Sequence, residues 1–214
     1  MYLPAQFSET DRATAAEVMR AYPFASLISN DEGALPYVTH LPLVLQESIE
    51  DGLVLLGHCA KANPHWRYLG ERPDALVTFT GPQAYLSPSV YPDLARVPTW
   101  NYIAVHCIVR SSLIEGAQEK DALLKQLIEQ HEPAYAGQWN SLDESFRRRM
   151  LSGIVGFKLE VRSLQCKIKL NQHRPESHEA MLALYSGGTP EERALSVWMR
   201  RLGMPKVITP PGKI

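Results

Sequence analysis

Short apolar runs separated by proline, glycine and other turn residues dominate the middle of this 214-residue sequence. Because many short strands with turns between them are typical of antiparallel sheets, the pattern favours an antiparallel barrel or sandwich over a parallel sheet. The sequence has neither a GxGxxG motif after a strand nor a Walker-type loop, so two common nucleotide-binding folds lose support. We expect strands at 24–29, 35–45, 53–59, 75–79, 83–87, 101–115 and 154–170, with a tight turn at 80–82.

Helical patterns lie before, between and after these runs. Ser8 and Asp11 resemble a capping box, which marks a helix start, and Pro23 is a stop signal. Apolar residues at helical spacing follow Gly116 and indicate a helix there. Together with the strands, these patterns predict a mainly β fold with flanking helices. The helices are expected at 8–22, 117–131 and 142–151, with two more between Glu176 and the end of the chain.

The bulk composition excludes some classes of protein. With a formal net charge of −1, the chain has no general attraction for nucleic acid, so DNA binding would need a local basic patch such as Arg147-Arg148-Arg149 or a partner. Three cysteines at scattered spacings form neither a disulfide framework nor a CxxC metal site, and they fit a reducing compartment. No signal peptide is visible, and no apolar run approaches the roughly 18 residues of a membrane span. We expect a cytoplasmic protein.

The segment GHCAKANPHW, residues 57–66, concentrates side chains that carry chemistry. A zinc site needs three or four ligands in a tetrahedron, and catalysis by a cysteine needs a neighbouring base. If 53–59 is a strand, His58 and Cys59 point to opposite faces and cannot easily act together. We therefore expect no metal here, and we interpret Cys59 as a small core residue.

The same segment also resembles an anion site. Asn63-Pro64 is a plausible helix start, and free backbone N–H groups at such a start favour a negative group. Lys61 lies just before it, and His58 and His65 flank it. This arrangement suits a phosphate cradle. A surface helix with a simple Asn63 cap and a solvated Lys61 explains the pattern equally well.

Two later stretches offer complementary chemistry. The proline-rich segment 80–102 contains Tyr85, Trp100, Asn101 and Tyr102, whose flat faces and polar groups suit a heteroaromatic ligand. The alternative is that these rings close the end of a barrel. Further on, Lys167 and Lys169 share one face of a predicted strand, which makes a local basic spot for a phosphate or for water.

Taken in order, these pieces resemble the PaiB family of FMN-binding negative transcriptional regulators. The resemblance runs from Met1 to about Pro175. It departs where the family usually has glycine at the place of Cys166 and tryptophan at the place of Val90. The matching stretches are MYLP, PFASLIS, THLPLVL, GHCAKANPHW, FTGPQAYLSPSVYP, VPTWNYIAVH, IVGFKLEV and KIKLNQHRP.

The resemblance implies a split antiparallel β-barrel related to pyridoxamine phosphate oxidase, a homodimer, and FMN as the cofactor. It implies a split-barrel domain over 1–175 with inserted helices at 117–151, and a helical extension over 176–214. For function it implies negative control of transcription, with DNA as a possible partner; the alternative is a flavin-dependent oxidoreductase of a small molecule. FMN is implied to lie at the dimer interface, where Lys167 and Lys169 either come from the partner subunit or fix the interface. The implied FMN contacts are His58, Lys61, Asn63, His65, Tyr85, Trp100, Asn101, Tyr102, Lys167 and Lys169.

Overall fold

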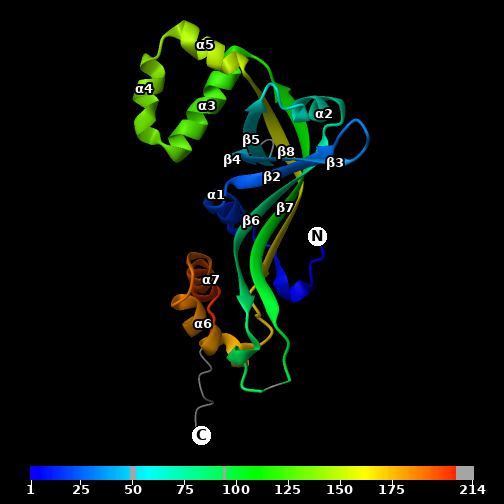
Figure 1. Ribbon diagram of the computed structural model, residues 1–214, viewed down its shortest axis with the longest axis vertical. Helices are drawn as coiled ribbons and strands as arrows, with labels where there is room; N and C mark the ends of the chain where they lie inside the picture. Colours follow the sequence, from blue (N-terminus) through cyan, green and yellow to red (C-terminus); the bar gives the residue numbers. More distant parts are fainter. Residues whose placement is uncertain (49–51, 94, 206–214) are drawn as a thin grey trace. The chain divides into compact units, whose positions relative to one another are not determined.

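The computed structural model describes residues 1–48, 52–93 and 95–205 (Figure 1). The chain divides into two compact units, each built from separate stretches of sequence. The terminal unit comprises Met1–Asp11, Thr80–Ala104 and Cys166–Ile214, and the central unit comprises Arg12–Phe79 and Val105–Gln165. The boundary that we expect between residues 175 and 176 stays a prediction. Part of the expected C-terminal extension, residues 206–214, lies outside the described residues.

The strands form one sheet with the order β3-β2-β6-β7-β8-β5-β4, and β1 pairs with β8. The pairs whose register is defined, β1 with β8, β2 with β3 and β6, and β5 with β4 and β8, are antiparallel. Over the described residues the order begins at β3 and ends at β4, so the sheet is open rather than a closed ring. The strands are β1 (Ser8–Glu9), β2 (Phe24–Asn30), β3 (Pro36–Pro42), β4 (Val44–Ser48), β5 (Gly52–Ala60), β6 (Asp74–Leu86), β7 (Thr99–Ile114) and β8 (Ile154–Lys169).

Helices join these strands and follow them (Figure 1). Two helices that we expect in the middle of the chain correspond to α3 and α5, and two in the tail correspond to α6 and α7. Thr189 forms the capping box of α7 with Glu192. The helices are α1 (Arg12–Ala21), α2 (His65–Glu71), α3 (Ala117–His131), α4 (Ala136–Ser141), α5 (Glu144–Ser152), α6 (His178–Ser186) and α7 (Pro190–Arg201).

The core of the central unit is built around β5. This strand lies between β4 and β8, with Leu55 opposite Leu45 on one side and opposite Leu159 on the other. Its residues 53–56 are all buried, which explains why the sequence is continuously apolar there rather than alternating. Helix α3 covers part of this region. The cluster that it completes consists of Val44, Val54, Leu56, Leu123 and Leu127.

The first helix starts later than its sequence suggests. We expect it to begin at Ser8, but α1 begins at Arg12, so the capping-box interpretation of Ser8 and Asp11 is wrong. Ser8 instead pairs with β8, opposite Lys167, and the Asp11 N–H donates to the Glu9 carboxylate at 2.8 Å. Pairing with a distant strand therefore overrides a local helix signal.

Two expectations about strand ends are also wrong. The segment 80–82 is not a turn, because β6 runs through it; a Cβ on Gly81 would lie 3.2 Å from Ile103, so this glycine allows close packing. The expected strand over 35–45 is two strands, β3 and β4, separated at Leu43. The Leu43 N–H donates to the Pro23 carbonyl at 3.0 Å, outside both strands.

Close packing at Gly57 gives a test of this core. A Cβ at this position would lie 2.5 Å from Leu43 and 3.0 Å from Phe157, both core side chains. We expect Gly57→Ala to lower the free energy of unfolding by about 1–3 kcal/mol, measured by urea denaturation.

The matched control is Gly137→Ala. Gly137 lies in helix α4, and nothing stands within 4 Å of the Cβ that it would gain. This change should leave stability unchanged or raise it by about 0.5–1 kcal/mol, since alanine is the better helix former. An equal loss in both variants would contradict the close packing at Gly57.

Candidate functional site

The structure places the predicted contact residues in both units. His58, Lys61, Asn63 and His65 belong to the central unit. The other six belong to the terminal unit; they are Tyr85, Trp100, Asn101, Tyr102, Lys167 and Lys169.

Backbone contacts fix the segment 57–66 at the end of β5. The Lys61 N–H donates to the Gly153 carbonyl at 2.8 Å, and the indole N–H of Trp66 donates to the Lys61 carbonyl at 3.0 Å. The Lys61 side chain is exposed. Its ammonium group is thus free to meet an anion, while the backbone beneath it is held in place.

Asn63 organises the start of α2. Its side-chain oxygen accepts the His65 N–H at 3.0 Å, which is the capping bond that the sequence suggests, although α2 begins at His65 rather than at Pro64. The same oxygen accepts the Tyr37 hydroxyl at 3.3 Å, and the side-chain N–H of Asn63 donates to Thr39 at 3.1 Å. The Asn63 side chain is therefore engaged within the protein.

His65 is buried, and both of its ring nitrogens have partners. Nδ1 lies 2.7 Å from the Thr39 hydroxyl, and Nε2 lies 3.0 Å from the Ser29 hydroxyl. Burial lowers the pKa of His65 to about 4, so the ring is neutral at physiological pH. His65 thus ties α2 to β2 and β3, and its charge is not available to a phosphate.

His58 and Cys59 differ in what they can offer. His58 is half-buried, and its Nδ1 has no hydrogen-bond partner, which leaves a polar atom for a ligand or a water molecule. Burial lowers the pKa of His58. Burial also raises the pKa of Cys59, which keeps its thiol protonated and unreactive at neutral pH.

Two lysine ammonium groups lie around the ring of Tyr102 in the terminal unit. Lys167 Nζ lies 5.1 Å from the ring centroid, and Lys169 Nζ lies 6.0 Å from it. Lys167 is only 6% exposed, yet its ammonium donates to a single backbone carbonyl, that of Tyr2, at 3.1 Å. Lys169 donates to the Thr99 hydroxyl at 2.7 Å and to the Trp100 carbonyl at 2.6 Å.

Neither ammonium has an acidic partner in the part of the chain that the structure describes. Among the described residues, no Asp or Glu forms an ion pair with Lys167 or Lys169. Burial, and then the charge of Lys167, lower the pKa of Lys169. Burying a charge without a counter-ion is costly, so an anion brought to this place would be stabilised.

Tyr85 and Trp100 present flat apolar faces next to this pair. Their rings meet edge to face at 6.2 Å, and each side chain is about half exposed. The Trp100 indole N–H donates to Gln83 at 3.1 Å, which fixes the plane of the ring. Such a pair can stack against a heteroaromatic ring without rearranging.

Asn101 behaves differently from its neighbours. It is fully buried, its side-chain N–H donates to the Tyr185 hydroxyl at 3.0 Å, and its oxygen has no partner. The Tyr185 hydroxyl also donates to the Tyr85 carbonyl at 3.4 Å. Helix α6 therefore anchors the segment 97–102 from within, a role that the sequence alone does not suggest.

The two departures from the family pattern lie inside the terminal unit. Cys166 and Val90 are 2% and 6% exposed, so both side chains fill space in the interior. Burial, followed by the charge of Glu9, raises the pKa of Cys166 to about 12. Both residues therefore alter packing rather than the exposed surface of the unit.

A family model described as "Putative FMN-binding domain" matches residues 1–163. The chain belongs to this family. FMN is accordingly its cofactor, and the predicted resemblance to PaiB is confirmed by a relative from Bacillus subtilis, "Protease synthase and sporulation protein PAI 2". That relative is 36% identical over 182 residues, which cover 83% of this chain and 84% of the relative.

Solved structures confirm the split-barrel fold. The flavocytochrome Anf3 from Azotobacter vinelandii matches with a TM-score of 0.61 and 17% identity, over 77% of this chain and 70% of that one. An FAD and heme binding protein from Mycobacterium smegmatis matches with a TM-score of 0.59 and 16% identity, over 76% and 73%. At these identities the likeness concerns the fold alone. No helix in the described part of the chain is long and apolar enough to cross a membrane.

The observed chemistry fits FMN. The cofactor combines an anionic phosphate with a flat isoalloxazine ring. The terminal unit offers two ammonium groups, which have no acidic partner among its described residues, and two half-exposed aromatic rings. The central unit offers the exposed Lys61 and the unpartnered Nδ1 of His58.

The low pKa of His65 predicts a pH-dependent stability. In the unfolded chain this ring titrates near 6.5, whereas in the folded protein its pKa is about 4. Between these values the unfolded chain binds the extra proton, so stability is full above about pH 6.5 and falls toward pH 4 by up to about 3 kcal/mol. Urea unfolding across this range should show a smaller pH slope for His65→Gln. An unchanged slope would mean that His65 is not the titrating group.

The contact between Asn101 and Tyr185 predicts a stability effect. Tyr185→Phe leaves the buried amide of Asn101 with only the Met181 sulfur as acceptor. We expect a loss of about 1–3 kcal/mol in the free energy of unfolding. As a control, Tyr85→Phe removes the hydroxyl of a half-exposed tyrosine and should cost less than about 0.5 kcal/mol. Equal effects would argue against the anchoring role of Tyr185.

Proposed function

We propose that this chain holds the anionic part of FMN with Lys167 and Lys169 of the terminal unit. The observation that carries this proposal is the pair of ammonium groups around Tyr102, one of them buried, neither with an acidic partner in the described part of the chain. A phosphate or a negatively charged flavin ring would neutralise them through charge-assisted hydrogen bonds.

The other predicted contacts differ in how freely their side chains can meet FMN. Tyr85, Trp100 and Tyr102 suit the isoalloxazine because their faces are flat and two of them are half-exposed. Asn101, Asn63 and His65 are engaged in internal hydrogen bonds, so their role in this proposal is to hold the neighbouring residues in place.

When bound, FMN supplies a redox-active ring that accepts one or two electrons, and the protein supplies its binding and orientation. The chain's own contribution is electrostatic. Positive groups beside a flavin favour its reduced, anionic form.

A titration of dialysed protein with FMN, followed by flavin fluorescence and absorbance, tests the lysine pair. We expect saturation at about one FMN per chain, and Lys169→Gln should weaken binding about 10- to 100-fold through loss of a charged hydrogen bond. Arg162→Gln is the control, because Arg162 is exposed and pairs only with Glu160. No saturation with the unaltered protein, or equal losses in both variants, would contradict the proposal.

Lys61→Ala in the same titration tests the segment 57–66. If the Lys61 ammonium meets the phosphate, affinity should fall by about 1–3 kcal/mol. Unchanged affinity would remove Lys61 from the site and leave this segment as a capped helix on the sheet.

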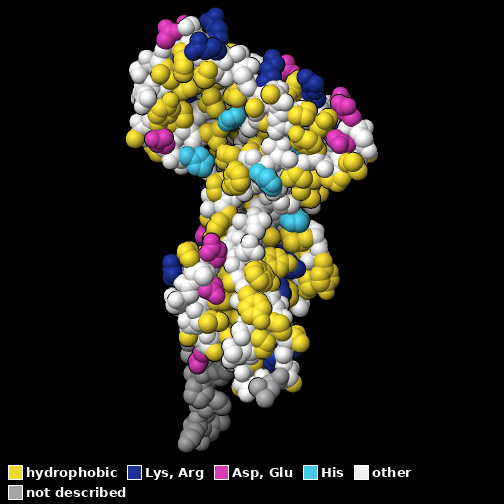
Figure 2. Space-filling model, in the orientation of Figure 1, with side chains coloured by type: hydrophobic (Ala, Val, Ile, Leu, Met, Phe, Trp, Pro, Cys, Tyr) yellow, Lys and Arg dark blue, Asp and Glu magenta, His cyan; other side chains and the backbone are white. Residues whose placement is uncertain are grey.

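A regulatory role is supported by the relation to PaiB proteins. We propose that the chain acts as a negative regulator of transcription. Figure 2 shows Lys and Arg side chains gathering over α5, where Arg148 and Arg149 are exposed. A DNA contact there should give retention on a DNA or heparin column that weakens steeply with salt. Passage through both columns at low salt would argue against DNA as a partner.

The alternative function is that of a flavin-dependent oxidoreductase acting on a small molecule. The FMN-binding family of the chain and the half-exposed faces of Tyr85 and Trp100 support it. Anaerobic bleaching of the FMN-loaded protein by NADH or NADPH would favour this function. A flavin that resists both reductants would favour the regulator.

We also propose that the chain forms a homodimer and resides in the cytoplasm. Large apolar side chains are exposed in both units, among them Tyr2, Val97, Phe24 and Leu35, and Figure 2 shows much hydrophobic surface. Three free, buried cysteines suit a reducing compartment. Light scattering after gel filtration should give twice the mass of the chain, and a monomeric mass would contradict the dimer.

A further inference from the structure

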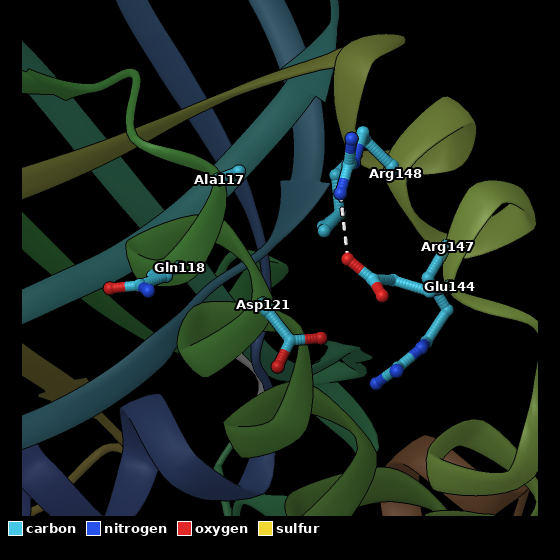
Figure 3. Close-up of a pocket in the computed structure, with 7 residues that line it drawn as sticks. Ala117, Gln118, Asp121, Glu144, Arg147 and Arg148 are labelled. Carbon is cyan, nitrogen blue, oxygen red and sulfur yellow. Dashed lines mark hydrogen bonds and ion pairs between the residues drawn. The ribbon is translucent and has the colours of Figure 1, made fainter.

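A cleft lies between α3 and α5 in the central unit, away from every residue assigned to FMN. Its volume is about 480 Å³, which falls within the range of small-molecule sites. Figure 3 shows side chains of both helices reaching into it. The lining residues are Ala117, Gln118, Asp121, Glu144, Arg147, Arg148 and Leu151.

The two helix faces that line the cleft are polar. Gln118 and Asp121 lie one turn apart on α3, and Glu144, Arg147 and Arg148 share one face of α5. Helices that pack directly on each other present apolar stripes. A pair of charged faces with space between them is better suited to a polar ligand than to a helix–helix core.

Each carboxylate of the cleft already forms an ion pair with a basic side chain. Glu144 pairs with Arg148 at 2.6 Å, the contact drawn in Figure 3. Asp121 pairs with Lys125 at 2.7 Å and accepts the Trp139 indole N–H at 2.9 Å. Burial works to raise the pKa of Asp121, but these hydrogen bonds outweigh it and the pKa is lowered. Asp121 is therefore ionised, and each of the two carboxylates already has a basic partner.

Arg147 is the remaining cation. It is half-buried, its Nε is shielded from solvent without a hydrogen-bond partner, and it forms no ion pair with a described acidic residue. In Figure 3 its guanidinium points into the space between the helices, opposite Asp121 but not bonded to it. Two acidic and two basic side chains line the cleft, and the charge of Arg147 helps to lower the pKa of Asp121. Arg147 is nevertheless the lining cation that forms no ion pair with a described acidic residue, and its planar guanidinium is of the kind that recognises oxyanions in a bidentate manner.

We propose that this cleft binds a small organic molecule that carries an oxyanion group, a carboxylate or a phosphate. The oxyanion engages the guanidinium of Arg147, and the body of the ligand lies against Leu151 and Ala117. Gln118 offers an amide that can bond either a hydroxyl or a carbonyl of the ligand.

The cleft and the segment 57–66 have one neighbour in common, the turn that follows α5. The Lys120 ammonium donates to the carbonyls of Leu151 and Ile154, at 3.0 and 3.2 Å. The carbonyl of Gly153, which lies between these two residues in the sequence, accepts the Lys61 N–H. Leu151, which lines the cleft, thus lies two residues from the carbonyl that holds the Lys61 backbone.

Isothermal titration with succinate, benzoate and inorganic phosphate tests the cleft in the full chain. We expect saturable binding of at least one probe at millimolar concentration or below, and a loss of about tenfold or more in Arg147→Gln. Arg149→Gln is the matched control, since Arg149 is the next arginine but one on α5, does not line this cleft and lies over Phe146. It should change affinity less than about twofold.

The outcomes separate the ligand classes. Binding of succinate or benzoate without phosphate identifies a carboxylate site, and the reverse identifies a phosphate site. No saturation with any probe, or equal losses in the two variants, overturns the proposal. If Arg147→Gln fails to fold, Arg147→Lys keeps the charge without the planar group and should still weaken binding; undiminished binding in that variant also overturns it. The FMN affinity of these variants should be unchanged. The test of the cleft is therefore independent of the test of the flavin site.

Discussion

The backbone pairing of β8 is the constraint on which both units depend. Its first residues, from Ile154 to Glu160, pair with β5 in the central unit, and its far end pairs with β1 in the terminal unit. Register along one strand determines which face each side chain takes, so the pairing of Lys167 with Ser8 also sets the face of Lys169. A slip by one residue would turn both ammonium groups away from Tyr102. The electrostatics of the terminal unit thus follow from hydrogen bonds that involve no side chain.

Burial has opposite effects on His65 and on Lys167. His65 is buried neutral, with a partner on each nitrogen, and it contributes to stability above its unfolded pKa. Lys167 is buried with a single carbonyl partner, which costs stability in the absence of an anion. A buried charge without a counter-ion raises the affinity of the protein for an anion that neutralises it. At Lys167, burial of the charge therefore lowers the stability of the fold and raises its affinity for an anion.

Much of the fold could be predicted from the sequence, because period-two alternation and helical spacing are local signals. They located β2, β5, β7 and β8 within a few residues. The errors at Ser8 and at 80–82 arose where a cap or turn signal was overridden by pairing with a strand far along the chain. The lysine pair and the aromatic segment were also visible in the sequence. The partners of Asn63, His65 and Asn101 were not, because Thr39, Ser29 and Tyr185 have no local feature that marks them as hydrogen-bond partners.

The stretch that matches the family model ends at residue 163, inside β8. The last residues of that strand carry both ammonium groups, and α6 beyond it anchors Asn101. Domain boundaries drawn from sequence families are often used to choose which part of a protein to express, align or compare. For this chain, a boundary at the end of the match would separate the aromatic segment from the charges and the helix that complete it. A fragment that stops at residue 163 would consequently lack the two lysines that we propose as FMN contacts.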